Sequence, residues 1–303
     1  MVRGTRHFAK IMALAATFSS ECFSASAPRS IEVLGHRGAR ASRPENTLSA
    51  FRFAIDQGVD VLELDVQLSK DGHLIVAHDR LVPVALCRSM EGKDLSASVA
   101  FTDLTLVEIK NLDCGSQRHQ DFPNQATAQK SQVPTLEEVF DLVTSNHSHD
   151  AQRIKLQIEA KIVPRYTRDT SAPTVIANAI MAAAKKYKLT NRIVIQSFDH
   201  RVISVVKKIQ PTIKTAALLS ADFPDWVNVI KSVNADILSP HIDWVTKEAV
   251  AAVHKYGAKV MPYTANNEAD WSHLIDCGVD GIITDDPKSL ITFLRSQGLR
   301  QGA

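Results

Sequence analysis

Apolar and polar residues follow two alternating patterns along most of this chain. Short apolar runs, typical of buried strands, are followed by stretches in which apolar residues recur at every third or fourth position, typical of amphipathic helices. The first such pair is a strand over residues 31–35 and a helix over 46–58. The next strand, 59–66, is followed by the turn Lys70-Asp71-Gly72 and an apolar run over 74–77, which predicts a β-hairpin.

The alternation resumes in the second half of the chain. A helix is predicted from Thr135, a suitable N-cap, to Val143, and Glu138 is placed as the reciprocal partner of a capping box. The strand–helix pairs that follow are 154–160 with 174–187, 193–197 with 200–209, 213–219 with 224–233, 236–239 with 246–256, 259–263 with 267–277, and 281–284 with 287–297.

These elements predict an α/β fold. Counting the hairpin once, there are about eight strand–helix units, which is the size and rhythm of a (β/α)8 TIM barrel. A doubly wound open sheet is the alternative, but it would have to accommodate the same eight strands. Residues 79–133 break the rhythm with polar and turn residues and a short helix near 104–109. We therefore expect one domain over 28–303 with a small insertion after the hairpin, covering the mouth of the barrel.

The first 27 residues have the layout of a secretory signal peptide. A basic start precedes a short apolar run over residues 11–18, and Ala25-Ser26-Ala27 is a small-residue cleavage signal. A frayed cytoplasmic N-terminus is the alternative, and a lipid anchor at Cys22 is disfavoured because Glu21 precedes it. The sequence therefore predicts an exported protein, periplasmic or secreted, that begins at residue 28.

The charge balance argues against a nucleic-acid partner. The full chain has 35 basic and 33 acidic residues, and removing residues 1–27 leaves 32 of each. A nucleic-acid-binding protein would carry a basic stripe. No later segment is apolar enough for a transmembrane helix, and the sequence does not indicate an oligomeric state. Of the remaining cysteines, Cys87 and Cys114 could form a disulfide in an oxidising compartment, or they and Cys277 could be buried thiols.

Charged side chains gather at the ends of the first three parallel strands, where a TIM barrel has its active site. Glu63 and Asp65 are two positions apart, so both leave the same face of their strand. Neighbouring carboxylates repel unless a cation or proton lies between them. With Glu159 as a third ligand, these oxygens predict one hard divalent cation, Mg²⁺ or Ca²⁺. Ordinary solvated carboxylates are the alternative.

Two histidines and an arginine bracket this acidic pair. His36 and Arg37 follow the first strand between two glycines, and His78 ends the return strand of the hairpin. Imidazoles are suited to acid and base work near neutral pH, and a guanidinium binds phosphate oxygens with two parallel hydrogen bonds. A lone histidine is more often structural, but this combination indicates metal-assisted attack on a phosphodiester.

These motifs resemble the glycerophosphodiester phosphodiesterase family over essentially all of residues 31–295. The matching motifs are Gly35-His36-Arg37-Gly38-Ala39, Pro44-Glu45-Asn46-Thr47, Glu63-Leu64-Asp65-Val66, Lys70-Asp71-Gly72 and His78-Asp79, then Pro134-Thr135-Leu136, Ile158-Glu159-Ala160-Lys161, Gln196-Ser197-Phe198, Tyr263-Thr264-Ala265-Asn266 and Gly281-Ile282-Ile283-Thr284-Asp285-Asp286-Pro287. The N-terminal motifs are the most specific.

The resemblance implies a TIM barrel that cleaves glycerophosphodiesters to glycerol 3-phosphate and an alcohol. It implies a divalent cation held by the three carboxylates, with His36 and His78 as the acid–base pair. Substrate contacts are then expected from the following side chains: Arg37, Lys161, Glu45, Phe198, Tyr263 and Asn266.

Two departures from the family pattern concern the choice of head group. Tyr263 stands where the family usually has tryptophan, and residues 81–88 lack the usual Arg-Thr-Thr-like run. A lysophospholipase D-like or phospholipase D-like activity on the same scaffold is therefore an alternative. A non-catalytic barrel that binds phosphate esters is disfavoured, because none of the motif residues is lost.

Overall fold

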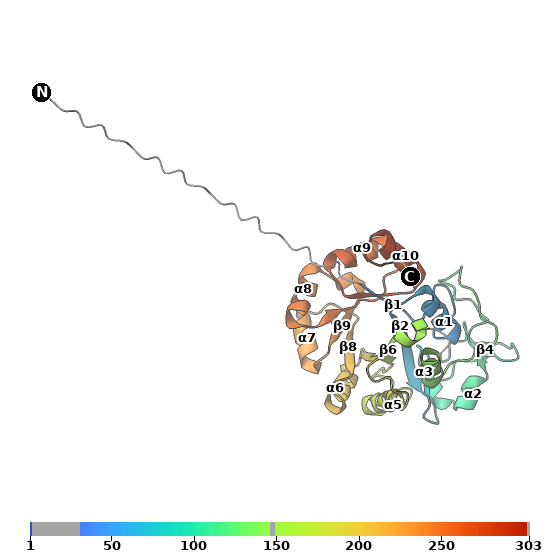
Figure 1. Ribbon diagram of the computed structural model, residues 1–303. Coiled ribbons are helices and arrows are strands. Elements are labelled where there is room, and N and C mark those ends of the chain that lie inside the picture. The colour runs from blue at the N-terminus through green and yellow to red at the C-terminus, as the bar shows by residue number, and fades with distance from the viewer. Residues whose placement is uncertain (2–30, 146–148, 302–303) are drawn as a thin grey trace.

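We describe the protein from a computed structural model, which covers Met1 and residues 31–145 and 149–301. Apart from Met1, the predicted signal peptide lies outside these residues. Among these residues the sheet has nine strands: the antiparallel β3 (Leu74–Val76) pairs with β2 alone, and eight parallel strands follow one another in the order β10-β9-β8-β7-β6-β2-β1-β11 (Figure 1). Their bounds are β1 Glu32–Gly35, β2 Val61–Leu68, β6 Lys155–Ala160, β7 Ile193–Ser197, β8 Lys214–Leu219, β9 Ile237–Pro240, β10 Lys259–Val260 and β11 Gly281–Thr284.

The two ends of this sheet meet and close it into a barrel. Backbone hydrogen bonds join the segment around β10 to β11, from the amide of Asp280 to the carbonyl of Val260 (2.9 Å) and from Ile283 to Pro262 (3.0 Å). The predicted TIM barrel is therefore confirmed. The strand predicted over 259–263 is shorter than expected, because Pro262 has no amide hydrogen with which to extend a ladder.

Helices surround the barrel in the predicted order (Figure 1). Their bounds are α1 Leu48–Gln57, α2 Leu106–Lys110, α3 Leu136–Thr144, α4 His149–Arg153, α5 Pro173–Lys186, α6 His200–Ile209, α7 Trp226–Val233, α8 Lys247–Tyr256, α9 Glu268–Cys277 and α10 Pro287–Ser296. The capping box of Thr135 and Glu138 is present, and Gly58 ends α1 in the left-handed conformation that glycine adopts readily. The short α4 was not predicted.

The parallel register decides which side chains meet inside the barrel. Val61, Glu63 and Asp65 alternate with Leu62 and Leu64 along β2, and the two leucines are fully buried in the core between barrel and helices. β2 does not end at residue 66 as expected but continues to 68, because its last residues pair with the antiparallel β3 (Leu74–Val76). The acidic pair therefore lies inside the strand, near the C-terminal edge of the barrel.

The segment between β3 and α3 packs as a small unit of its own. It contains β4 (Arg88–Ser89), β5 (Leu112–Asp113) and the 3₁₀ helix η1 (Phe101–Asp103), around a separate apolar cluster. A disulfide joins Cys87 to Cys114, which decides between the two possibilities that the sequence left open, and Cys277 is buried and unbridged.

This unit contacts loops at the C-terminal end of the barrel. The amide of Gln125 donates to the carbonyls of Arg40 and Arg43 in the loop after β1. Arg80 pairs with Asp169 in the loop after β6. Among the described residues, no helix has the length and apolar character needed to cross a bilayer.

Candidate active site

A cavity of about 260 Å³ lies at the C-terminal end of the barrel. It is lined by side chains from different strand ends, among which are His36, Arg37, Glu63, His78, Glu159 and Tyr263. With Phe198, which also lines it, the cavity therefore brings together both predicted catalytic histidines, two of the three predicted metal ligands and three of the predicted substrate contacts. The third carboxylate, Asp65, lies buried beside the other two.

Three carboxylates form the centre of the site. Asp65 on β2 lies directly opposite Glu159 on β6 in the parallel register, and Glu63 points to the same side of β2. Ligand atoms of the three residues lie within 4.8 Å of one another, and all three side chains are buried. The predicted metal-ligand set is thus one cluster in the described part of the chain.

Each carboxylate has partners that fix its direction. Glu63 accepts hydrogen bonds from the backbone amide of Arg37 (2.9 Å) and from Gln196 (2.7 Å). Asp65 accepts one from Asn46 (2.9 Å), and Glu159 pairs with Lys161 at 2.7 Å.

The electrostatics of the cluster show an excess of negative charge. Burial and repulsion from Asp65 and Glu159 raise the pKa of Glu63 well above its usual value. Burial also raises the pKa of Glu159, although Lys161 opposes this. For Asp65 burial is outweighed by His78, Arg37 and Lys161, which lower its pKa. Three converging oxygen donors whose negative charges repel one another are the donor set expected of a divalent cation site.

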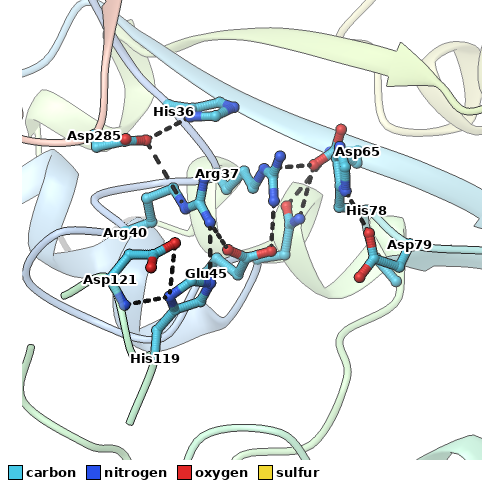
Figure 2. A network of polar contacts seen from close by, with 12 residues as sticks. His36, Arg37, Arg40, Glu45, Asp65, His78, Asp79, His119, Asp121 and Asp285 are labelled. Carbon is cyan, nitrogen blue, oxygen red and sulfur yellow. Dashed lines mark hydrogen bonds and ion pairs between the residues drawn. The ribbon is translucent and has the colours of Figure 1, made fainter. Parts of the chain in front are cut away.

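The two histidines have the same arrangement in different surroundings. His36 Nδ1 lies 2.5 Å from Asp285 Oδ1, and His78 Nδ1 lies 2.7 Å from Asp79 Oδ1 (Figure 2). The His36 and Asp285 side chains are 14% and 8% exposed, whereas those of His78 and Asp79 are 32% and 58% exposed. Burial lowers the pKa of His36, opposed by its bond to Asp285, so this imidazole is neutral near pH 7.

Arg37 owes its direction to an unusual backbone. It adopts a positive φ of 50°, and Gly38 follows with φ of 91°, where an added Cβ would lie 2.8 Å from Ala50 atoms. This turn directs the Arg37 guanidinium between Glu45, at 2.6 Å, and Asp65, at 3.5 Å (Figure 2). Both acids and Glu63 raise the pKa of Arg37 although burial opposes them, so the guanidinium stays charged.

The remaining predicted substrate contacts divide into two groups. Phe198 and Tyr263 form one wall of the cavity, with ring centroids 5.8 Å apart in an edge-to-face arrangement. The Tyr263 hydroxyl donates to the carbonyl of Leu219 (3.0 Å). Glu45 and Asn266, by contrast, bind other protein groups: Glu45 pairs with Arg37 and Arg40, and Asn266 bonds to Asp285.

Sequence reasoning gave no role to several residues that the site uses. They are Asp285, Arg40, Asn46 and Gln196, whose contacts are described above. Their signal was present, because Asp285, Asn46 and Gln196 lie within the quoted motifs. Arg40 lay outside them. Its guanidinium lies against Glu45 at 2.7 Å and over the ring of Phe122 at 4.9 Å, so the inserted unit contacts the site through it.

Comparisons with known proteins give a consistent result. The profile of the "Glycerophosphoryl diester phosphodiesterase family" matches residues 36–289. A glycerophosphodiester phosphodiesterase of Caldanaerobacter subterraneus is 34% identical over 266 residues, which are 88% of this chain and 98% of that protein. One from Bacillus altitudinis is 31% identical, over 84% of this chain and 95% of that protein.

Solved structures share the fold. A Silicibacter pomeroyi structure has a TM-score of 0.83 and 31% identity, covering 90% of this chain and 95% of that one. An Oleispira antarctica phosphodiesterase in complex with the product sn-glycerol-3-phosphate has a TM-score of 0.72 at 23% identity, covering 88% and 97%.

Proposed function

The chain belongs to the glycerophosphoryl diester phosphodiesterase family and is an enzyme of that class, and we propose that it hydrolyses glycerophosphodiesters to glycerol 3-phosphate and an alcohol with the help of one divalent cation. One observation carries the proposal. Three clustered buried carboxylates, two of which line a single cavity, meet there with two histidines, each with an aspartate on Nδ1, and a charged arginine.

The donor set fits a hard cation. Carboxylate oxygens of Glu63, Asp65 and Glu159 would hold it, and oxygen ligands without cysteine or histidine favour Mg²⁺ or Ca²⁺ over zinc. When bound, the cation neutralises phosphate charge and stabilises charge that develops on the phosphate oxygens.

The side chains of the protein supply the rest of the chemistry. Arg37 and Lys161 keep their positive charge beside the acidic cluster and are placed to bind and orient the phosphate. His36, neutral near pH 7, accepts a proton at Nε2 from the attacking oxygen, which forms the new bond to phosphorus. His78 gives a proton to the departing alcohol oxygen as its bond to phosphorus breaks. Water and a substrate hydroxyl can both serve as the nucleophile in this scheme.

A substrate panel tests this function. The purified protein is incubated with Mg²⁺ or Ca²⁺ and with glycerophosphodiesters of different head groups, and the products are identified by ³¹P NMR. We expect glycerol 3-phosphate from several of them. Cleavage of a lysophospholipid but of no deacylated substrate would favour the lysophospholipase D-like alternative, and binding without any product would indicate a non-catalytic barrel.

We also propose that the protein is exported. Residues 1–27 have the signal-peptide layout, and the disulfide between Cys87 and Cys114 supports export because such bonds persist in oxidising compartments. Cell fractionation with sequencing of the mature N-terminus tests this: we expect the protein outside the cytoplasm, beginning at residue 28. A cytoplasmic protein that retains its first residues would refute it.

A further inference from the structure

The buried aspartate beside His36 has no role in the scheme above, and the barrel itself places it there. Gly35 at the end of β1 lies opposite Thr284 at the end of β11, and the chain continues from them to His36 and Asp285. The backbone amide of His36 also donates to the carbonyl of Thr284 (2.9 Å). The imidazole and the carboxylate are therefore adjacent because the first and last strands of the barrel are neighbours.

The carboxylate of Asp285 is held on its far side as well. Asn266 donates from Nδ2 to Oδ2 of Asp285 (2.8 Å), and its Oδ1 accepts the backbone amide of Asp285 (2.9 Å). The other carboxylate oxygen, Oδ1, is 2.5 Å from His36 Nδ1 and 3.9 Å from Arg40 Nε. With both oxygens engaged and the side chain 8% exposed, the carboxylate has little freedom to turn away from the imidazole.

The second histidine provides a comparison within the same site. Asp79 makes the equivalent contact to His78, but its side chain is 58% exposed and it is the next residue in the chain. A solvated carboxylate without a second clamp restrains an imidazole less than a buried, clamped one, because water competes for both partners.

We propose that Asp285 is a positioning residue that fixes His36 in the Nδ1–H tautomer, so that the unprotonated Nε2 faces the cavity and can accept a proton. This inference rests on the proposed function. A carboxylate on Nδ1 can only accept a hydrogen bond, so the ring proton is placed on that nitrogen. Once Nε2 takes up a proton, the same carboxylate stabilises the imidazolium.

The substitution Asp285→Asn tests the proposal with little change in shape. Asn266 keeps its donor toward one atom of the new side chain, which favours an amide oxygen there and turns the NH₂ group toward His36. Nδ1 must then accept, and the ring proton moves to Nε2. We expect kcat to fall about a hundredfold or more, the range for losing a general base, while KM changes less than about threefold.

Two-bond ¹H–¹⁵N correlation spectra of the imidazole rings give a readout that does not depend on turnover. The His36 signals, assigned with His36→Gln, should show Nδ1–H in the wild type and Nε2–H in Asp285→Asn. Asp79→Asn should lower kcat less than about tenfold. The matched control is Asp286→Asn, since the Asp286 carboxylate is engaged by Ser289 at the start of α10 rather than by His36; it should keep wild-type kcat and tautomer.

Wild-type kcat in Asp285→Asn, or an unchanged His36 tautomer, would overturn the proposal. If Asp285→Asn does not fold, Asn266→Ala takes its place: it keeps the carboxylate but removes one clamp, and we expect a several-fold fall in kcat with the Nδ1–H tautomer retained. An Nε2–H tautomer in the wild type would also overturn the proposal. A wild type that shows the expected tautomer but releases no glycerol 3-phosphate would instead refute the proposed function.

Discussion

The substitution Glu159→Gln separates two effects of the acidic cluster, one on stability without cation and one on cation binding. An activity assay alone would not distinguish them. In the cation-free protein, a charged Glu159 is repelled by the neighbouring carboxylates. For two full charges 4.8 Å apart, at an effective dielectric constant of about 20, the repulsion is about 3.5 kcal/mol. Removing the charge relieves this repulsion but also weakens the 2.7 Å pair with Lys161. Because the two effects oppose each other, the free energy of unfolding without cation should change by less than about 1 kcal/mol.

With cation the same substitution should have a large effect. A ligand present at a hundred times its dissociation constant stabilises a protein by about 2.7 kcal/mol. If losing one carboxylate weakens binding about a hundredfold, the stabilisation at the same concentration falls to about 0.4 kcal/mol. At roughly 2–4 °C per kcal/mol, the cation-induced rise in Tm should be about 5–9 °C smaller in the variant.

Thermal unfolding with EDTA and then with a series of Mg²⁺ or Ca²⁺ concentrations measures both effects. Glu268→Gln, an exposed acid in the first turn of α9, is the matched control and should behave as the wild type. If Mg²⁺ or Ca²⁺ raises the Tm of Glu159→Gln as much as that of the wild type, the cation binds elsewhere and the reasoning fails.

Three further predictions concern the histidines, the disulfide and a charged group far from the site. His36→Ala and His78→Ala should each lower kcat about a hundredfold or more in steady-state assays while calorimetry still detects cation binding; wild-type turnover in either would reject the acid–base assignment. Reduction of the Cys87–Cys114 bridge should increase hydrogen exchange within 79–133 before it does so in the barrel strands, and should change head-group preference before it changes global stability. Faster hydrogen exchange to the same extent in both regions would contradict this. The pKa of Asp236 is lowered, because hydrogen bonds from Lys207, Lys214 and the backbone amide of Thr215 outweigh the opposite effect of burial. The charged Asp236 contributes about 2 kcal/mol to the free energy of unfolding at a pH above its ordinary, unfolded-state pKa, and this contribution is lost as the pH falls through the lowered pKa of the folded state. The difference in the free energy of urea unfolding between the wild type and Asp236→Asn should therefore shrink in acid.

The barrel itself could be predicted from the sequence because each strand and helix has a local periodicity. The position of the acidic pair on one face of β2 follows from the two-residue repeat of a strand, without knowledge of its neighbours. The acidic pair lies beside Glu159 because β6 and β2 are neighbours in the order β6-β2-β1. A TIM barrel predicts this order of strands. The pattern over 259–263 predicts a strand of five residues, whereas β10 ends at Val260 because Pro262 has no amide hydrogen for the ladder.

What could not be predicted depends on contacts between residues far apart in the chain. Asp285 is 249 positions from His36, and only closure of the barrel between β1 and β11 makes them partners. The unit formed by residues 79–133 has no periodic pattern, because a small cluster around a disulfide is held by a few apolar side chains rather than by a long amphipathic face. The contact of Phe122 with Arg40 could not be predicted either, because Phe122 lies in this non-periodic segment.

The most direct test of the central claim is the release of glycerol 3-phosphate by protein from which divalent cations have been removed. Protein treated with chelator and then dialysed is assayed on a glycerophosphodiester without added metal and with Mg²⁺ or Ca²⁺. We predict that activity is abolished by chelation and restored by at least one of the two cations in the wild type, but not at the same concentration in Glu159→Gln. Undiminished release of glycerol 3-phosphate after complete removal of divalent cations would contradict the account.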